Sequence, residues 1–330
     1  MPGVGEFVAA AWRDGLGPDD RDRIAKLVAA GEQSPMFELF VALYQLGNDV
    51  KVELPPPPDG AAARVLYASA NLSLARLALD PPTIDSAIER LGDALDGLNP
   101  ADPKGDAAQA WADLALGELA VAIRDVRAAR RRYEAVATVG RPIALRITAM
   151  IRLAGLAMDR LDAEPARNWA RKATALAETS KRPAHAARAR IGWGLLDYLA
   201  GDVAAMRKTL GAAIDKGKDS AIARLMLAGI EKGGKAMQLL ADGLKEAVQQ
   251  GDPLGYTLCV LIGSRRYVTM NRDGDALVTI SAGIVQLQSF APFFASILVD
   301  ERAEWMRDWG SERWAEAESV AMRLLEAATR

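Results

Sequence analysis

Six short breaks recur along the last two-thirds of the chain, and they constrain the fold more than any other feature of the sequence. They lie 33 to 40 residues apart, near Asp125, Asp162, Gly201, Gly234, Gly274 and Gly310. Each break separates two segments whose apolar residues recur at intervals of three and four, as on one face of a helix. Repeats of this length are typical of stacked helical hairpins, because one hairpin cannot bury its apolar face alone. The sequence therefore predicts about six stacked hairpins.

The helix after each break carries small or apolar residues at positions i, i+4 and i+7. Small side chains at these positions let the two helices of a hairpin approach closely. The predicted stripes are Ala129/Tyr133/Val136, Ala166/Ala170/Ala173, Ala205/Thr209/Ala212, Ala236/Leu240/Gly243, Ala276/Ile280/Gly283 and Ala317/Ala321/Leu324. We expect each stripe to be buried inside its own hairpin.

The composition agrees with an all-α protein. Alanine is abundant, aromatic residues make up 6% of the chain, and long alternating apolar runs are absent, so helix is favoured over sheet. Half of the residues are apolar and a quarter are charged, which is typical of a soluble folded protein. Arginine greatly outnumbers lysine, which together with the alanine content hints at a bacterial source.

Two of the predicted hairpins carry a fuller pattern: a large apolar residue followed by glycine, then an aromatic residue, a glycine turn and an alanine. The matching residues are Trp193-Gly194, Tyr198, Gly201 and Ala213, and Ile262-Gly263, Tyr267, Gly274 and Ala276. Leu153-Ala154, followed by Ala166, Ala170 and Ala173, matches more loosely. From about Asp106 to Arg330 the chain thus resembles the tetratricopeptide-repeat family. It departs from that family because most units exceed about 34 residues, the tyrosines come one place late and the closing proline is mostly missing.

The resemblance implies a right-handed superhelix, a TPR-like α-solenoid, in which the first helix of each hairpin lines a groove. The implied lining consists of Leu116, Leu119, Ile151, Met158, Arg188, Leu195, Tyr198, Val260 and Tyr267, with Arg265 and Arg266 at the rim. This surface is mostly apolar with arginines nearby, so an amphipathic or extended partner segment with acidic flanks would suit it. Alternatively, these residues pack against one another and leave no groove.

The remaining chain divides into shorter segments. Residues 1–53 form an N-terminal helical segment in which Pro18 suits a first helical turn and Ser34 suits a cap. Residues 54–60, with four consecutive prolines, read as an extended linker that acts as a stiff spacer or as a recognition ligand. Residues 61–105 contain a degenerate hairpin, with helices over 61–79 and 83–98 and Thr83 as the expected cap. Residues 106–330 hold the array.

The sequence offers no convincing catalytic set. His185 is the only histidine and Cys259 the only cysteine, so a disulfide within one chain is impossible and a Cys/His metal site is not expected. We interpret His185 as a residue at a hairpin start or on the surface, and Cys259 as a small core residue. No phosphate-binding loop is present, and we predict no cofactor. The predicted function is a non-catalytic scaffold or adaptor for another protein.

Two other function classes stay open. An all-α enzyme could use the carboxylates of Asp19, Asp20 and Asp22, although no second acidic motif completes a metal site and acidic residues also favour a helix N-terminus. A self-assembling structural protein would stack an unsatisfied terminal repeat on another copy, so a homo-oligomer is possible.

Nucleic acid and membrane are not expected partners. The arginine-rich segment Arg127–Tyr133 lacks interleaved aromatic residues, and the whole chain has a net charge of −2. The segment Ala276–Val299 has no charged residue and is long enough to span a bilayer. Its glutamines and Pro292 instead favour two buried helices joined by a turn at Ser289–Pro292. The N-terminus lacks the basic region of a secretory signal, so we predict a cytoplasmic protein.

Overall fold

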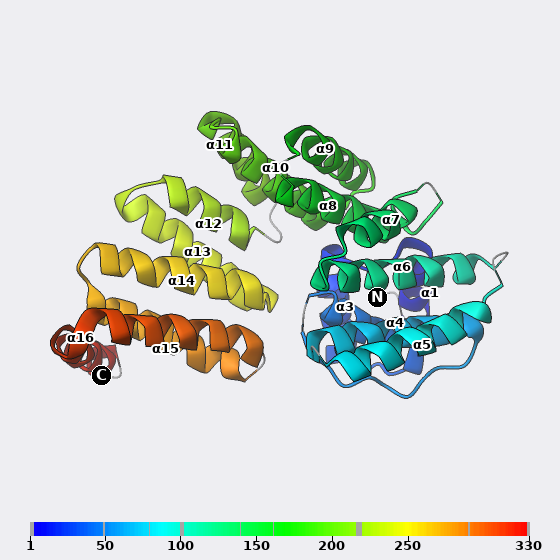
Figure 1. The fold of residues 1–330 in the computed structure, drawn as a ribbon, viewed down its shortest axis with the longest axis horizontal. Coiled ribbons are helices and arrows are strands. Elements are labelled where there is room, and N and C mark those ends of the chain that lie inside the picture. The colour runs from blue at the N-terminus through cyan, green and yellow to red at the C-terminus, as the bar shows by residue number, and fades with distance from the viewer. Residues whose placement is uncertain are drawn as a thin grey trace. The chain divides into compact units, whose positions relative to one another are not determined.

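The computed structural model describes residues 3–48, 50–78, 80–99, 102–138, 140–160, 162–215, 220–289 and 291–328. Within these ranges every regular element is helical, and most consecutive helices within each unit pack against one another. The predicted all-α class is therefore confirmed. The chain packs as two compact units, Met1–Lys218 and Asp219–Arg330, so the predicted array 106–330 extends over both. Figure 1 shows the helices of each unit.

Unit 1 begins with short helices: α1 (Val4–Asp14), the 3-10 turn η1 (Pro18–Asp20), α2 (Arg21–Ala29) and α3 (Pro35–Leu46). Ser34 caps α3 as predicted, because its hydroxyl oxygen accepts a hydrogen bond from the Phe37 amide at 3.2 Å. Non-helical chain over residues 50–58 then leads to α4 (Ala61–Ala78) and α5 (Pro81–Asp96). The prediction that Thr83 caps α5 is wrong. The cap is Asp80, three residues earlier, whose carboxylate accepts from the Thr83 amide.

Three hairpins complete unit 1. They are α6 (Pro103–Ala122) with α7 (Val126–Val136), α8 (Ile143–Asp159) with α9 (Ala163–Thr179), and α10 (Pro183–Leu199) with α11 (Val203–Asp215). The first of them shows why small residues matter. The fully buried Tyr133 ring lies against Gly117 on α6, where even a methyl group would come within 2.5 Å of the ring.

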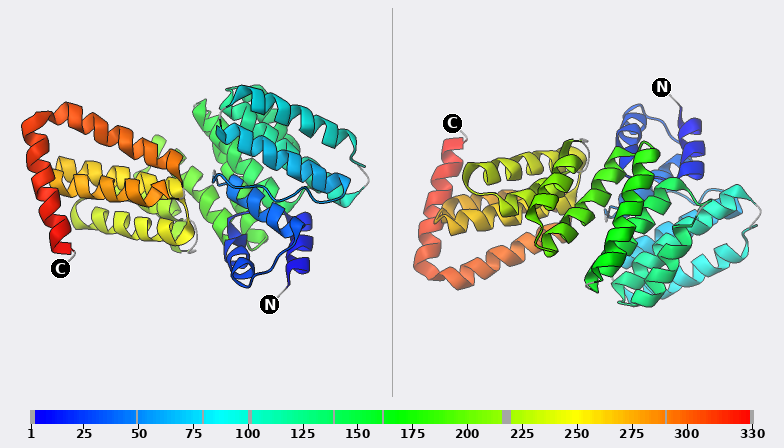
Figure 2. Two further views of the ribbon diagram at one scale, coloured as in Figure 1. Left: turned by 90° about the horizontal axis from the view of Figure 1, so that it is seen from below. Right: turned by 90° about the horizontal axis from the view of Figure 1, so that it is seen from above.

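Unit 2 contains α12 (Ala221–Ile230), α13 (Gly233–Gln250), α14 (Pro253–Thr269), α15 (Asp273–Gln288) and α16 (Pro292–Ala328). Helix α16 is interrupted at Gly310, where φ is 73° and ψ is 169°, and the chain changes direction there (Figure 2). Gly283 on α15 lies so close to Val260 and Leu298 that a methyl group would meet either side chain at under 3 Å. In both units a glycine thus lets a large side chain of a neighbouring helix approach the backbone closely.

All six predicted breaks fall within two residues of a helix boundary or interruption. Four of the predicted stripes are buried at all three positions. A fifth, Ala317/Ala321/Leu324, is buried except at Leu324, which is 39% exposed. The stripe Ala205/Thr209/Ala212 is wrong by one position. Met206, Leu210 and Ala213 are the buried side chains of α11, because Leu210 packs against Gly194 on α10.

The uncharged stretch Ala276–Val299 forms the end of one helix and the start of the next, as predicted. Its fully or nearly fully buried side chains include Ile280, Ile284 and Leu298, which belong to the core of unit 2. Among the described residues, no helix has both the length and the apolar character needed to cross a membrane.

Candidate functional site

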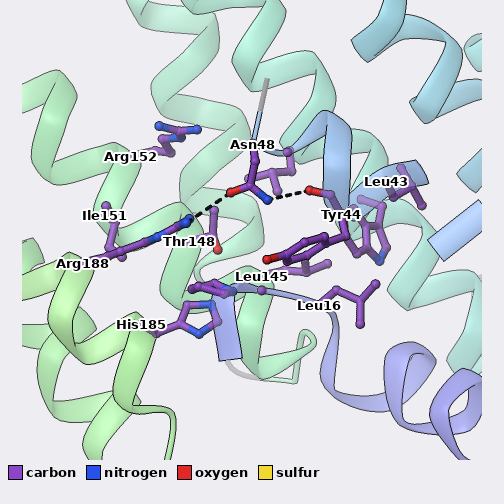
Figure 3. A pocket seen from close by; sticks show the side chains of 15 residues that line it. Leu16, Leu43, Tyr44, Asn48, Leu145, Thr148, Ile151, Arg152, His185 and Arg188 are labelled. Atoms are coloured by element: carbon purple, nitrogen blue, oxygen red, sulfur yellow. Dashed lines mark hydrogen bonds between the residues drawn. The ribbon is translucent and has the colours of Figure 1, made fainter. Parts of the chain in front are cut away.

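A pocket of about 120 Å³ lies in unit 1, where the N-terminal segment meets the first helices of the three hairpins (Figure 3). One wall comes from the N-terminal segment and contains Leu16, Gly17, Pro18, Leu43, Tyr44, Gly47 and Asn48. The other comes from α6, α8 and α10 and contains Trp111, Leu114, Leu145, Thr148, Ile151, Arg152, His185 and Arg188. A single water needs roughly 10–15 Å³ of such space. The pocket therefore has room for a small organic group.

Asp19 joins the two walls. Its carboxylate accepts hydrogen bonds from the Ala184 amide at 2.7 Å and from the His185 amide at 3.2 Å. These amides belong to the first turn of α10, where backbone N–H groups lack partners within the helix. The same carboxylate lies 2.6 Å from His185 Nδ1. Asp19 thus caps α10 from a distant part of the chain and orients the imidazole.

His185 is buried, with a side chain only 1% exposed. Burial lowers its pKa, and this outweighs the opposing effect of Asp19. Burial also tends to raise the pKa of Asp19, but the hydrogen bonds from His185 and Ala184 prevail and lower it. At neutral pH the pair therefore consists of an ionised Asp19 and a neutral His185 whose proton is on Nδ1.

His185 Nε2 is a buried acceptor without a hydrogen-bond partner in the described part of the chain. The imidazole lies against Gly17, where a methyl group would come within 2.1 Å of Cε1. Only glycine at position 17 lets the ring lie this close to the N-terminal segment. The neighbouring Asp20 holds that segment in place, since its carboxylate accepts from the Gly17 amide at 3.0 Å and from Arg182 Nη1 at 3.4 Å.

The other polar groups of the pocket are held by their neighbours. Arg188 Nη2 donates to Asn48 Oδ1 at 3.1 Å, and Asn48 Nδ2 donates to the Tyr44 carbonyl at 2.8 Å; both bonds are drawn in Figure 3. Thr148 Oγ1 donates to the Ala144 carbonyl of its own helix at 3.0 Å. Arg152 pairs with Glu118 at 2.6 Å.

The pocket is lined by the oriented His185, by guanidinium groups and by apolar side chains. An aspartate–histidine pair is also the basic half of a hydrolytic triad. The described residues, however, place no hydroxyl or thiol in hydrogen-bond contact with Nε2, and the Thr148 proton is used within α8.

Two of the residues predicted to line a groove meet in this pocket. Ile151 comes from α8 and Arg188 from α10. Leu116 and Leu119, both on α6, pack instead in the core of unit 1, where Leu119 is fully buried and Leu116 partly buried. Met158, at the end of α8, packs against a small buried cluster, while Leu195 is partly buried on α10 and Tyr198 is 48% exposed at its end.

The predicted residues of unit 2 make internal contacts. Val260 is buried, and Tyr267 packs beside the same core with the Arg272 guanidinium 4.9 Å from its ring centroid. Arg265 forms a two-point ion pair with Glu301 at 2.7 and 2.6 Å. Arg266 donates to the Ala228 and Glu231 carbonyls at the end of α12.

Sequence reasoning missed the pairing of Asp19 with His185. The interpretation of His185 as a residue at a hairpin start is confirmed, because α10 begins at Pro183, but a surface position is wrong. Cys259 is buried as predicted, and burial raises the pKa of its thiol to about 12. The one available signal for the missed pair was a short acidic segment able to cap a helix that begins without an acidic residue of its own.

The three carboxylates of the acidic segment contact other residues of the chain. Asp22 lies 3.8 Å from Arg21, while Asp19 and Asp20 bind α10 and its preceding arginine. In the described ranges no three His, Cys, Asp or Glu side chains gather closely enough to hold a metal ion. No protein-family model matches this chain, and no curated protein matches it either.

Proposed function

We propose that this protein is a non-catalytic scaffold or adaptor, a TPR-like right-handed α-solenoid whose first-helix face in unit 1 binds a segment of a partner protein. One observation carries the proposal: α6, α8 and α10, the first helices of three successive hairpins, contribute to the same pocket wall. The tetratricopeptide-repeat resemblance implies this arrangement for a ligand groove. The position of Ile151 and Arg188 in that wall supports it.

The chemistry of the wall indicates the kind of segment. Leu145 and Ile151 supply apolar surface, and Arg188 and Arg152 supply positive charge. A partner segment with one apolar anchor and an acidic group next to it would match both. The acidic group would mainly raise the association rate, since charges at the edge of an interface steer encounter.

The test compares partners captured by matched variants of the intact protein. Proteins captured from the native host by the wild type are purified and titrated against wild type, Ile151→Glu and Arg188→Ala. We expect each variant to weaken binding of the true partner at least about tenfold, which corresponds to about 1.4 kcal/mol. Arg127→Ala, on the exposed face of α7, serves as the charge-matched control and leaves the affinity unchanged. A partner that binds all four proteins equally would contradict an interface on the first-helix face.

A second function, self-assembly, is favoured by exposed apolar residues on α16. Met306 and Met322 are each 60% exposed. Light scattering over a hundredfold concentration range would reveal association, and Met306→Glu with Met322→Glu would abolish it if α16 forms the contact. A molar mass that stays at one chain, 35.3 kDa, throughout would rule this function out.

A further inference from the structure

We propose that a second copy of this chain docks on unit 1, and that its turn between α6 and α7 enters an open hollow beside α3. The turn, residues 121–127, presents exposed apolar side chains next to arginines. The hollow has an apolar floor with glutamates around it. No residue of the turn lines the hollow of its own chain, so the two surfaces are not paired within one molecule. This contact goes beyond the adaptor function and differs from the α16 contact considered above.

The hollow lies where α2 ends, alongside α3 and the extended residues 53–55, and it holds about 460 Å³. A single water needs roughly 10–15 Å³ of such space, so a whole large side chain can enter. The apolar surface of the hollow comes mainly from Val28, Val41 and Leu54, and Val28 is 55% exposed. The hollow therefore offers apolar surface that an incoming side chain would bury.

The charge of the hollow selects a cationic occupant. Its charged lining residues are Glu32, Glu38 and Glu53, whereas none of the described lining residues is a lysine, arginine or histidine. Among the described residues, none of these glutamates has an ion-pair or side-chain hydrogen-bond partner. Three carboxylates around one apolar surface repel one another. An apolar side chain flanked by positive charge would bury that surface and remove the repulsion.

The turn between α6 and α7 supplies this chemistry. Val121 is 40% exposed and Ile123 is 65% exposed, and the exposed Arg124 and Arg127 follow them. Neither arginine has an ion-pair or side-chain hydrogen-bond partner in the described part of the chain. The one acidic residue of the turn, Asp125, is already used, because its carboxylate caps α7. The turn thus presents apolar anchors and two unpaired cations.

The backbone of the turn also points to an external contact. Arg124 has a φ of 62°, in the left-handed region that side chains with a Cβ disfavour. The equivalent residue is Gly201 in the turn between α10 and α11 and Asn271 in the turn between α14 and α15, and both residue types suit this conformation. No hydrogen bond or ion pair of the Arg124 side chain with another described residue offsets the cost. A contact with a second chain would account for an arginine at this position.

The turn and the hollow match in both apolar and charged character. Ile123 would occupy the apolar floor, which would place Arg124 and Arg127 near the glutamates. Because the two surfaces lie on different elements, the contact is heterologous: one copy gives its turn and the other its hollow. A single turn covers only part of the roughly 800 Å² that each partner contributes to a standard interface. We therefore expect a weak, reversible association that is sensitive to salt.

The first measurement is the molar mass of the intact protein by sedimentation equilibrium. It is made in a Met306→Glu/Met322→Glu background, which removes any contact through the exposed methionines of α16. We expect the mass to rise above that of one chain, 35.3 kDa, with a Kd of about 10–500 μM. Raising the NaCl concentration from about 50 mM to about 500 mM should weaken the association at least about fivefold, since exposed charges form the contact.

Two variants separate the two surfaces. Ile123→Glu removes the apolar anchor of the turn, and Glu38→Lys reverses one charge of the hollow. We expect each variant to associate at least about tenfold more weakly than the background protein. A mixture of the two contains one intact turn and one intact hollow, so it should form pairs of chains with the Kd of the background protein. Should Glu38→Lys not fold, Glu53→Lys, on non-helical chain, tests the same charge.

Arg124→Gly distinguishes a binding role from a structural one. Glycine suits the φ of this residue, so the thermal midpoint should rise while the association weakens about threefold or more. Leu199→Glu is the matched control for Ile123→Glu, because Leu199 is 62% exposed at the turn between α10 and α11. We expect this control to associate like the background protein.

A protein that remains one chain at every concentration in this background would overturn the proposal. So would mixed variants that fail to pair, a Kd that ignores both salt and Arg124→Gly, or equal weakening by Leu199→Glu. If the protein stays one chain while a captured protein requires Glu38, the hollow serves a different partner. If only the α16 substitutions abolish association, the α16 contact stands and this one fails. None of these results bears on the adaptor proposal, which Ile151→Glu and Arg188→Ala decide.

Discussion

Units 1 and 2 each contain a carboxylate that caps a helix from outside that helix, and the two caps are completed differently. In unit 2 Glu246 accepts from the amide and hydroxyl of Ser220, from Arg224 Nε and from Gln250 Nε2, at 2.5 to 3.1 Å. In unit 1 Asp19 accepts from two amides of α10 and from His185.

The difference lies in the side chain that each cap orients. Arg224 is a permanent cation, so the Glu246 cluster is charge-balanced by the chain itself. His185 is neutral, and its second nitrogen, Nε2, is buried against Gly17 without a hydrogen-bond partner among the described residues. A buried carboxylate near a helix N-terminus thus stabilises the fold in both units, but it orients a neutral imidazole in unit 1 and a permanent cation in unit 2.

Removing the two carboxylates should give the largest effect. We expect Asp19→Ala to lower the free energy of unfolding of unit 1 by about 3 kcal/mol, through a lost cap and an unpaired buried donor. Glu246→Ala should cost unit 2 less, about 2 kcal/mol, since Arg224 can turn toward solvent whereas His185 cannot. Hydrogen exchange of α10 and α12 during urea unfolding measures each unit separately. Equal costs would show that the two caps are equivalent.

A methyl group at position 17 should have the next largest effect. The new Cβ would overlap the imidazole, so Gly17→Ala should destabilise unit 1 by about 2 kcal/mol and displace the His185 NMR signal. Gly192→Ala on α10 meets no atom within 4 Å, and it should stabilise the helix by about 0.5–1 kcal/mol. Thermal unfolding of both variants provides the measurement. A stable Gly17→Ala protein with an unchanged histidine signal would contradict the close packing of the ring.

The two tyrosines predicted to line one groove should behave differently. Tyr267 packs beside the core of unit 2 and under the Arg272 guanidinium, so Tyr267→Ala should cost about 1–2 kcal/mol. Tyr198 is half-exposed, and Tyr198→Ala should stay within about 0.5 kcal/mol of wild type. Urea midpoints of the single variants distinguish them. A large loss of stability with Tyr198→Ala would mean that this ring is structural as well.

The contrast between the two units also marks the limit of sequence reasoning. The spacing of the apolar residues and the positions of the glycines predicted the helix boundaries. Gly201, for example, lies between two helices and adopts a φ of 78°, which other residues avoid. The same period identified the buried face only to within one residue on α11, because either face of that alanine-rich helix could meet Gly194.

The pocket could not be predicted in this way. Asp19 and His185 are 166 residues apart, and no repeat relates them. Periodicity shows that a helix has a buried face, but not which distant segment covers it. The N-terminal segment lies outside the repeating pattern, and yet it supplies one wall of the pocket and the carboxylate that orients the histidine.

The smallest expected effect is a pH dependence confined to unit 1. Burial holds the pKa of His185 below its ordinary value of 6.5. At a pH between the lowered pKa of the folded chain and 6.5, the unfolded chain therefore binds a proton that the folded chain does not. The free energy of unfolding of unit 1 should therefore fall as the pH drops from about 7.5 to 5.5, by at most about 1.4 kcal/mol per pH unit.

Unit 2 has no histidine. Hydrogen bonds hold the pKa of Glu246 below its ordinary 4.5 despite the opposing effect of burial, so the stability that this group provides is lost only at lower pH. Hydrogen exchange of α10 and α12, corrected for the intrinsic pH dependence of exchange, measures both units in one sample. His185→Asn should remove the slope in α10 and leave α12 as it was. A slope that persists in this variant, or one that appears equally in α12, would mean that His185 is not the group that distinguishes the two units.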